Sequence, residues 1–343
     1  MPREPFGTAV DHAVIEKLTI SDGDLSADVI TIGATLQSLR VPGKGGVADV
    51  CLGFDDVEPY KKRHPYFGST AGRVAGRITG AQFTLDGQAY QIDKNEPADD
   101  PKHGLHGGFV GWDMLTWKVD DLADKSVRLS LQSANGDRGY PGAIDISVTY
   151  TLDGGALRLD YEATTSAPTP LAPTNHAYFN LAGAGNGDVL DHVLTVHAEE
   201  FAKTNEDFSF TGEKASVIGT PDDLRTPTKI AERIGQLHRK HGSMYFVEGD
   251  PGTLRPAAQL VCERGGRKMD VETDETCLQF YSGMMLDQIA GKAGQTYNQF
   301  GGLCLEAQAF PDALNHPGVE WGPLVLRPGE TYRQTTLYRF GSV

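Results

Sequence analysis

The chain has 343 residues, of which 39% are hydrophobic and 22% are charged, an ordinary composition for a globular protein. Its net charge of −15 argues against binding to nucleic acid or to an anionic membrane surface, because both require a basic face. The sequence has no apolar run long enough to span a membrane and no secretory signal at its start, so we expect a cytoplasmic protein.

Alternation of apolar and polar residues predicts a protein made mainly of antiparallel strands. The turn sequence Leu85-Asp86-Gly87-Gln88 predicts a hairpin that joins residues 81–85 to 89–92. Further alternating runs follow at 126–132, 144–152 and 157–161. Asp153-Gly154-Gly155 lies between the last two runs and predicts a second tight hairpin.

Helical periodicity is confined to one stretch, Pro227–Lys240. Ile230, Ile234 and Leu237 would share one face of a short helix there. One helix among many strands argues against alternating βα units and predicts a β-sandwich or barrel. Because no linker or repeat divides the chain, we expect one domain over residues 1–343.

The cysteine and histidine spacings do not predict a metal site or a disulfide framework. Two histidine pairs are three residues apart, His103 with His106 and His238 with His241, but no third ligand is patterned beside either pair. The dispersed cysteines, each with apolar neighbours, are predicted to be buried free thiols in a reducing compartment. These are Cys51, Cys262, Cys277 and Cys304.

Four patches dense in glycine, histidine, arginine, asparagine and carboxylate are candidates for a functional site. In the first patch, Arg73 and Arg77 lie among three glycines, and ligand binding and ion pairing explain them equally well. The other patches contain His106, His176 and Glu306. A carboxylate in an apolar run needs a partner or a raised pKa, and both are marks of acid–base chemistry. The patches are residues 65–78, 103–113, 174–181 and 302–312.

Together these patches resemble the galactose mutarotase, or aldose 1-epimerase, family. The resemblance extends from about residue 30 to 340. It implies a large single-domain antiparallel β-sandwich whose concave face binds a monosaccharide. It also implies interconversion of the α and β anomers of a free aldose, without a cofactor or a metal, by a monomer or homodimer. The matching segments are PYFGSTAGRVAGRI, LHGGFVGWDMLTW, RGYPG, TNHAYFNL, CLQFYSG, GGLCLEAQAFPDALN and LRPGETY.

The resemblance also implies roles for individual residues. Glu306 would be the base that takes the C1 hydroxyl proton, and His176 would be the acid that protonates the ring oxygen. We expect a bell-shaped pH profile whose acid limb comes from the carboxylate and whose basic limb comes from the histidine. Arg77 would also help to position His176. The residues expected to bind the sugar are Arg77, His106, Gln279 and Asn175.

The sequence departs from the family pattern at residues 241–247. The family usually has a sugar-binding aspartate there, and this chain has Ser243 or Met244 in that place. We therefore expect weaker binding of galactose and a shift toward a pentose or deoxysugar. Glu248 or Asp250 could supply the missing acid from a rearranged loop.

Three other functions compete with the epimerase prediction. A carbohydrate-binding protein without turnover would not need an acid and a base at one carbon. A glycoside hydrolase or lyase needs a pair of carboxylates, and the patches offer one obvious carboxylate. A phosphosugar epimerase needs basic residues at the far end of the sugar, and the net charge gives no hint of them. A neutral or cationic substrate is favoured unless a local pocket of arginine or lysine offsets the overall charge.

Overall fold

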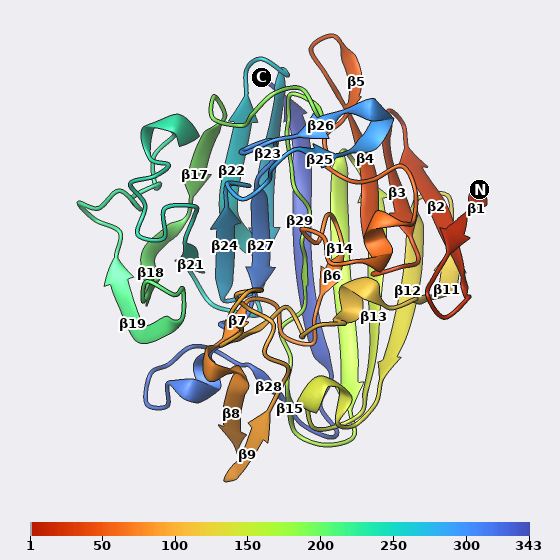
Figure 1. Cartoon of the computed structure of the whole chain (residues 1–343). Helices are drawn as coiled ribbons and strands as arrows, with labels where there is room; N and C mark the ends of the chain where they lie inside the picture. Colours follow the sequence, from red (N-terminus) through yellow and green to blue (C-terminus); the bar gives the residue numbers. More distant parts are fainter. Residues whose placement is uncertain (1) are drawn as a thin grey trace.

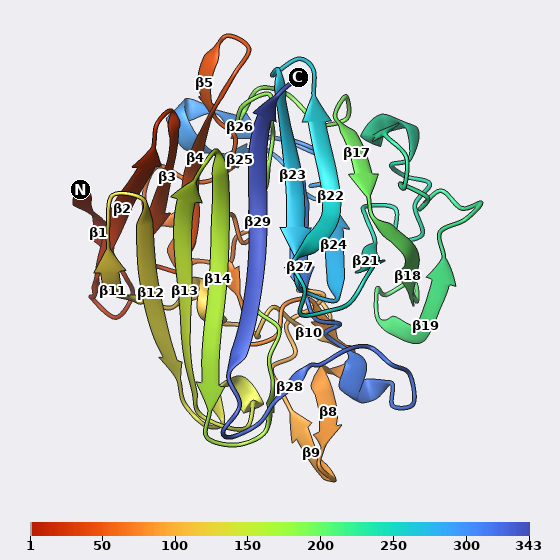
Figure 2. The same ribbon diagram turned by 180° about the vertical axis from the view of Figure 1, so that it is seen from behind.

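A nine-stranded antiparallel sheet forms one layer of the molecule, which we describe from a computed structural model over residues 2–343. Figure 2 shows this sheet from its outer side. Its strands, in spatial order, are β11 (Lys118–Leu122), β12 (Ser126–Ser133), β13 (Ile144–Asp153), β14 (Ala156–Thr165), β29 (Tyr332–Ser342), β23 (Arg267–Thr273), β22 (Arg255–Cys262), β17 (Val193–Val196) and β20 (Thr228–Lys229).

Two five-stranded antiparallel sheets form the opposite layer and lie in front of the large sheet in Figure 1. The first contains β1 (Arg3–Thr8), β2 (Val14–Asp22), β3 (Leu25–Ile30), β4 (Thr35–Gly43) and β5 (Gly46–Asp49). The second contains, in spatial order, β19 (Phe210–Ser216), β18 (Ala198–Thr204), β21 (Met244–Val247), β24 (Cys277–Tyr281) and β27 (Cys304–Gln308).

Short ladders and 3₁₀ turns occupy the connections between the sheets. The two-stranded ladders are β6 (Thr70–Ala71) with β16 (Thr174–Asn175), β7 (Arg77–Ile78) with β10 (Gly104–Leu105), β8 (Gln82–Leu85) with β9 (Gln88–Gln91), β15 (Thr169–Pro170) with β28 (Val325–Leu326), and β25 (Ile289–Ala290) with β26 (Thr296–Tyr297). The 3₁₀ turns are Pro59–Lys61, Thr79–Ala81, Trp112–Met114, Asp137–Gly139, Ile230–Glu232, Lys292–Gly294 and Ala313–Asn315.

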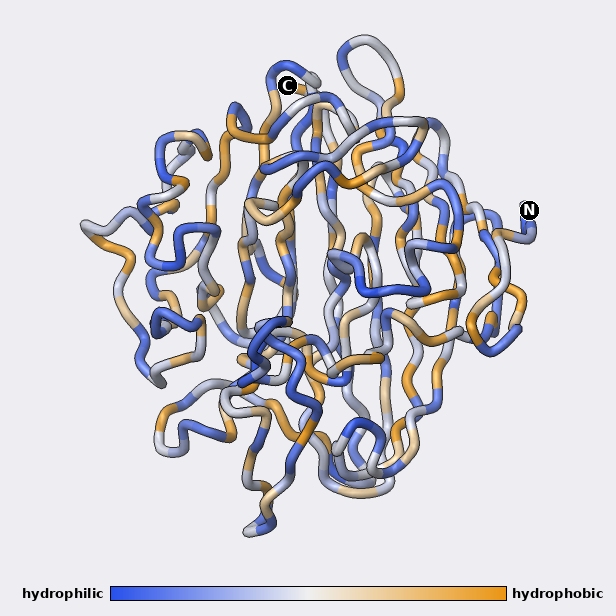
Figure 3. Tube along the Cα trace, viewed as in Figure 1, coloured by the Kyte–Doolittle hydropathy of each residue, from blue (hydrophilic) through white to orange (hydrophobic). Residues whose placement is uncertain are grey.

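The main hydrophobic core lies between the two layers, which confirms the predicted antiparallel β-sandwich. Leu157 and Leu159 on β14 point into it and alternate with the exposed Arg158, and the hydropathy of the strands alternates accordingly in Figure 3. The same core contains Leu278 of β24 and Leu305 of β27 from the opposite layer. A single domain over residues 1–343 stays a prediction, which this shared core supports.

Both predicted hairpins are confirmed. Asp153 pairs with Ala156 across the turn that joins β13 to β14, and the glycines between them have φ of 54° and 82°. Leu85 pairs with Gln88 across the β8–β9 turn. Asp and Gly fill that turn with φ of 50° and 80°, the left-handed conformation that tight hairpins require.

The predicted helix Pro227–Lys240 is wrong. This segment forms the short strand β20, the 3₁₀ turn Ile230–Glu232 and a series of turns. Gly235 has φ of +81°, which a right-handed helix cannot contain, so the chain bends there while Ile230 and Leu237 still reach the core. Within residues 2–343, no helix has the length and apolar character needed to cross a bilayer.

The predicted buried free thiols are confirmed for all four cysteines, Cys51, Cys262, Cys277 and Cys304. Cys51 and Cys277 are fully buried, and burial raises their thiol pKa well above its ordinary value. These groups therefore act as small apolar side chains in the core.

The glycine-rich loop after β10 packs its backbone directly against the segment before β7. Gly107 has φ of +90°, and a Cβ atom at this position would lie 1.8 Å from the carbonyl oxygen of Gly72. The amide of Trp112 donates to that same oxygen at 3.2 Å. This close approach fixes the backbone of His106, which directly precedes Gly107 and itself has φ of +50°.

We expect Gly107→Ala to lower the free energy of unfolding by about 3 kcal/mol, because it combines a left-handed backbone with a collision against backbone atoms. Gly87→Ala is the matched control. Gly87 has a similar φ of +80° but no atom within 4 Å of the added Cβ, so its cost is about 1 kcal/mol. Urea unfolding of both variants measures the difference, and equal losses would contradict the packing argument.

Candidate active site

A row of side chains across three strands forms the floor of a cavity of about 400 Å³. Met244 on β21 pairs with Gln279 on β24, and Gln279 pairs with Glu306 on β27. Residues directly opposite each other in a sheet point to the same face, and so do residues two apart on one strand. Tyr281 and Gln308 therefore join the row, and all five residues line the cavity.

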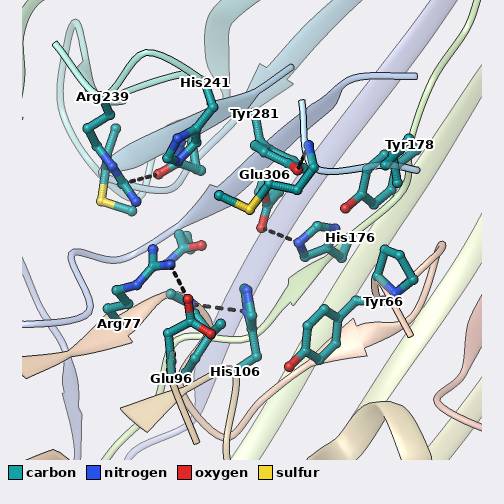
Figure 4. Close-up of a pocket in the computed structure, with 18 of the residues that line it drawn as sticks. Tyr66, Arg77, Glu96, His106, His176, Tyr178, Arg239, His241, Tyr281 and Glu306 are labelled. Carbon is teal, nitrogen blue, oxygen red and sulfur yellow. Dashed lines mark hydrogen bonds and ion pairs between the residues drawn. The ribbon is translucent and has the colours of Figure 1, made fainter. Parts of the chain in front are cut away.

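Two histidines from loops lie above this floor (Figure 4). His176 follows β16 directly, and its Nε2 is 3.6 Å from Oε2 of Glu306. His106 follows β10, and its ring centre is 5.1 Å from that of His176. The Nδ1 of His106 accepts a hydrogen bond from the amide of Gly76 at 3.2 Å, so a neutral His106 carries its proton on Nε2.

Aromatic rings hold His176 in place. The His176 ring stacks on Tyr66 at a centroid distance of 5.5 Å and on Tyr178 at 5.2 Å. Its Nδ1 contacts the Sγ of Cys304 at 3.5 Å. Because these contacts restrict rotation of the imidazole, its Nε2 stays directed at Glu306.

Burial shifts the pKa values of the two facing groups in opposite directions. Glu306 is 2% exposed, and desolvation raises its carboxyl pKa to about 8, although the positive charge of Arg239 opposes this shift. Desolvation lowers the pKa of His176 to about 4. Burial thus favours a protonated Glu306 beside a neutral His176. This order is the reverse of that expected from the sequence, since neither charged form is well solvated in the pocket.

Arginine side chains lie at the other end of the cavity. Arg77 donates to Glu96 at 2.9 Å, and Arg63 contacts the same carboxylate at 3.3 Å. Arg239 donates to the Oε1 of Gln279 at 3.2 Å. His241 also lines this end, and burial together with the nearby arginines lowers its pKa to about 3.

The structure brings most of the predicted site residues together. Glu306, His176, Arg77, His106 and Gln279 all line the one cavity. Arg77 hydrogen-bonds Glu96 rather than His176, so the expected positioning of His176 by Arg77 is not observed.

Asn175 is the exception among the predicted sugar-binding residues. It does not line the cavity, and its side-chain amide donates to the carbonyl of Gly68 at 2.7 Å and to the hydroxyl of Tyr150 at 3.1 Å. The alternation of a strand explains this result, because neighbouring residues point to opposite sides and His176 occupies the cavity side. Asn175 supports the loop below the site.

The two arginines of the first patch have different roles. Arg73 is 2% exposed, and its guanidinium donates to the carbonyls of Pro141 and Gly142 and to the hydroxyl of Ser133. It holds loops together, and only Arg77 reaches the cavity.

Sequence reasoning missed several residues of the cavity wall. Tyr178 carried a signal, because it lies two residues after His176 in the same motif. Arg239 carried none, because the segment before β21 was predicted to be helical, and His241 was considered only as one of a pair of histidines that could bind a metal. In the region of the missing aspartate, Met244 lines the cavity, whereas the buried Ser243 hydroxyl bonds Asp222. The suggested replacement acids, Glu248 and Asp250, are exposed and lie outside the cavity lining.

One set of side chains in the cavity has the chemistry to bind a metal ion. Ligand atoms of His106, His176 and Glu306 lie within 4.8 Å of one another. Two imidazoles and a carboxylate suit a divalent transition metal. Such an ion would need an ionised Glu306, and it would bind both Glu306 and His176. A reaction without metal therefore stays a prediction.

Comparison with known proteins agrees with this geometry. The family model described as aldose 1-epimerase matches residues 16–339. Galactose mutarotase of Rattus norvegicus is 39% identical over 328 residues, which cover 95% of this chain and 94% of that protein. Aldose 1-epimerase of Escherichia coli (strain K12) is 33% identical over 317 residues, covering 90% of each chain. A solved aldose epimerase homologue from C. elegans has a TM-score of 0.86 and 31% identity, covering 95% of this chain and 99% of its own. This chain belongs to the aldose 1-epimerase family.

Proposed function

We propose that this protein is an aldose 1-epimerase that interconverts the α and β anomers of a free monosaccharide. The observation that carries the proposal is the buried pair of Glu306 and His176, which face each other at 3.6 Å inside a cavity large enough for a small ligand. The family relatives named galactose mutarotase and aldose 1-epimerase support the same reaction. The buried free thiols are consistent with a reducing compartment such as the cytoplasm.

The reaction needs one base and one acid at the anomeric centre. Glu306 takes the proton of the C1 hydroxyl as the C1–O bond gains double-bond character, and the bond from C1 to the ring oxygen breaks. His176 gives its proton to the ring oxygen. The open-chain aldehyde then rotates about the C1–C2 bond, and the same proton transfers in reverse close the ring on the other face.

The electrostatics of the pocket support this direction of proton transfer. Ring opening converts an ionised Glu306 and a protonated His176 into two neutral groups. Burial favours the neutral pair, so it stabilises the state formed by ring opening relative to the starting ion pair. Arg239 opposes the effect at Glu306 and keeps its ionised form accessible.

Gln279 and Arg77 are proposed to bind sugar hydroxyls. Gln279 neighbours Glu306 in the same cross-strand row, and Arg77 faces the cavity from β7. His106 is proposed to donate from Nε2 to an oxygen near C1, since its Nδ1 is already engaged by Gly76. A monomer or homodimer remains the predicted assembly.

Glu306→Gln and His176→Asn should each lower turnover by about 10²–10⁴-fold, the usual contribution of a positioned acid or base. Polarimetry on freshly dissolved α-anomers of several aldoses measures the rate above spontaneous mutarotation. Glu275→Gln is the matched control. Glu275 is another buried glutamate with a raised pKa of about 7, but it lies outside the cavity lining, so its replacement should leave turnover unchanged. Near-native turnover in either site variant would exclude that residue as acid or base.

The pH profile of turnover should be bell-shaped, because the active pair carries a single proton. Below about pH 4, His176 takes up a second proton, and above about pH 8 Glu306 loses the shared one. We therefore expect the acid limb to follow the histidine and the basic limb to follow the carboxylate. In a His176→Asn variant with residual activity, Glu306 alone must be ionised to act as the base, so turnover should rise as the pH passes about 8. Turnover that is already maximal near pH 6 in this variant would contradict this order.

Zinc should inhibit the enzyme, since it can bind His106, His176 and Glu306 and so occupy the acid and the base. We expect the metal-free reaction to be insensitive to EDTA and the inhibition by zinc to be reversed by it. Loss of activity on chelation, restored by one divalent ion, would show that the reaction needs a metal.

A further inference from the structure

The guanidinium of Arg239 is buried in the cavity wall without an ionic partner. Arg239 is 5% exposed, and it donates one hydrogen bond, to the neutral Oε1 of Gln279 at 3.2 Å. Its Nε is buried and has no acceptor among residues 2–343. No carboxylate oxygen of these residues lies within 4.0 Å of its guanidinium nitrogens, the limit for an ion pair.

The other arginines of the cavity do not share this situation. Arg63 and Arg77 both contact the carboxylate of Glu96. Three arginines therefore face two carboxylates in the cavity lining, and one of those carboxylates, Glu306, is held in its neutral form by a raised pKa of about 8. The site is locally positive although the chain carries a net charge of −15.

Contacts with aromatic rings partly stabilise the guanidinium of Arg239 but do not neutralise its positive charge. Its Cζ lies 5.5 Å from the ring centre of Phe208 and 5.9 Å from that of Phe210. Burial and the nearby Arg77 lower the pKa of Arg239 to about 9, so the group remains charged at neutral pH. A buried charge without a counterion is costly, and an anionic ligand would remove that cost.

Arg239 also lies on the side of Glu306 that faces away from His176. In Figure 4, Arg239 and His176 are on opposite sides of Glu306, and Arg77 lies on the same side as Arg239. If the pair marks C1 of the sugar, the substituents on the far side of the ring point toward Arg239.

We propose that the preferred substrate is an aldose with an anionic group on the side of the ring remote from C1, and that Arg239 binds this group. The inference rests on the proposed epimerase function, which locates C1 at Glu306 and His176. The anion can be the carboxylate of an aldohexuronic acid or the phosphate of a sugar phosphate. The single free guanidinium matches one negative charge, and its planar fork fits a carboxylate.

The expectation of a neutral or cationic substrate excepted a local pocket of arginine or lysine, and the proposal falls under that exception. Arg239 and Arg77 are 162 positions apart in the chain by their numbers and meet only in the fold, so no local run of basic residues indicates a positive cavity.

The test compares binding and turnover for D-galactose, D-galacturonate and D-galactose 6-phosphate. Titration calorimetry with sugars already at anomeric equilibrium gives dissociation constants that do not depend on turnover, and polarimetry gives kcat/KM separately. We expect at least one anionic sugar to bind wild-type protein about 10-fold or more tightly than galactose. Arg239→Gln should weaken that binding by about 10–100-fold and galactose binding by less than about threefold.

Lys240→Gln is the matched control. It removes one positive charge from the neighbouring, exposed position outside the cavity lining, so it should leave the preference between anionic and neutral sugar unchanged. Whichever anionic sugar binds more tightly identifies the group as carboxylate or phosphate.

Two results would overturn the proposal. One is a wild-type protein that binds galactose as tightly as both anionic sugars, a result that does not require any variant to fold. The other is an Arg239→Gln variant that binds all three sugars more weakly by the same factor. That result would mean that Arg239 only positions Gln279. Tighter binding of an anionic sugar without mutarotation of any sugar would instead contradict the epimerase function, while the anion-binding role of Arg239 would still hold.

Discussion

The contact between the buried side chains of Glu306 and His176, 3.6 Å apart, is the interaction on which the site depends. Each group alone would be costly to ionise there, and together they hold one proton that either can carry. The rest of the site positions this pair. Strand β27 presents the carboxylate, while Tyr66 and Tyr178 hold the imidazole against it.

Paired strands position some of the site residues, and loops with fixed backbones position the others. Glu306 and Gln279 belong to paired strands whose other faces are buried in the core of the sandwich, so their spacing is set by the sheet. His106 and His176 come from loops, but these loops are fixed through backbone contacts, such as that of Gly107 with Gly72. A change of backbone far from the chemistry can therefore displace an acid or a base.

The sequence predicted the sandwich from a local signal and marked Glu306 and His176 as candidates, whereas their roles as base and acid came from the family resemblance. Strand alternation follows burial directly, and Glu306 and His176 stand out as ionisable residues in apolar runs. The helix over Pro227–Lys240 was predicted wrongly because three apolar residues can reach a core without a helix. Because of that error, Arg239 was not predicted to line the cavity. Asn175 was assigned to the sugar although its neighbour His176 takes the cavity side of the strand, and no pattern in a single sequence specifies which side that is.

The protonation state of the pair is the most direct test of this account. Infrared difference spectroscopy between wild-type protein and Glu306→Gln isolates the carboxyl band of Glu306. The account predicts a protonated carboxyl at about pH 6 that loses its proton near pH 8, because burial raises its pKa. An ionised carboxylate throughout the range from pH 5 to 8 would contradict the raised pKa of Glu306, and with it the argument that burial stabilises the neutral pair formed by ring opening.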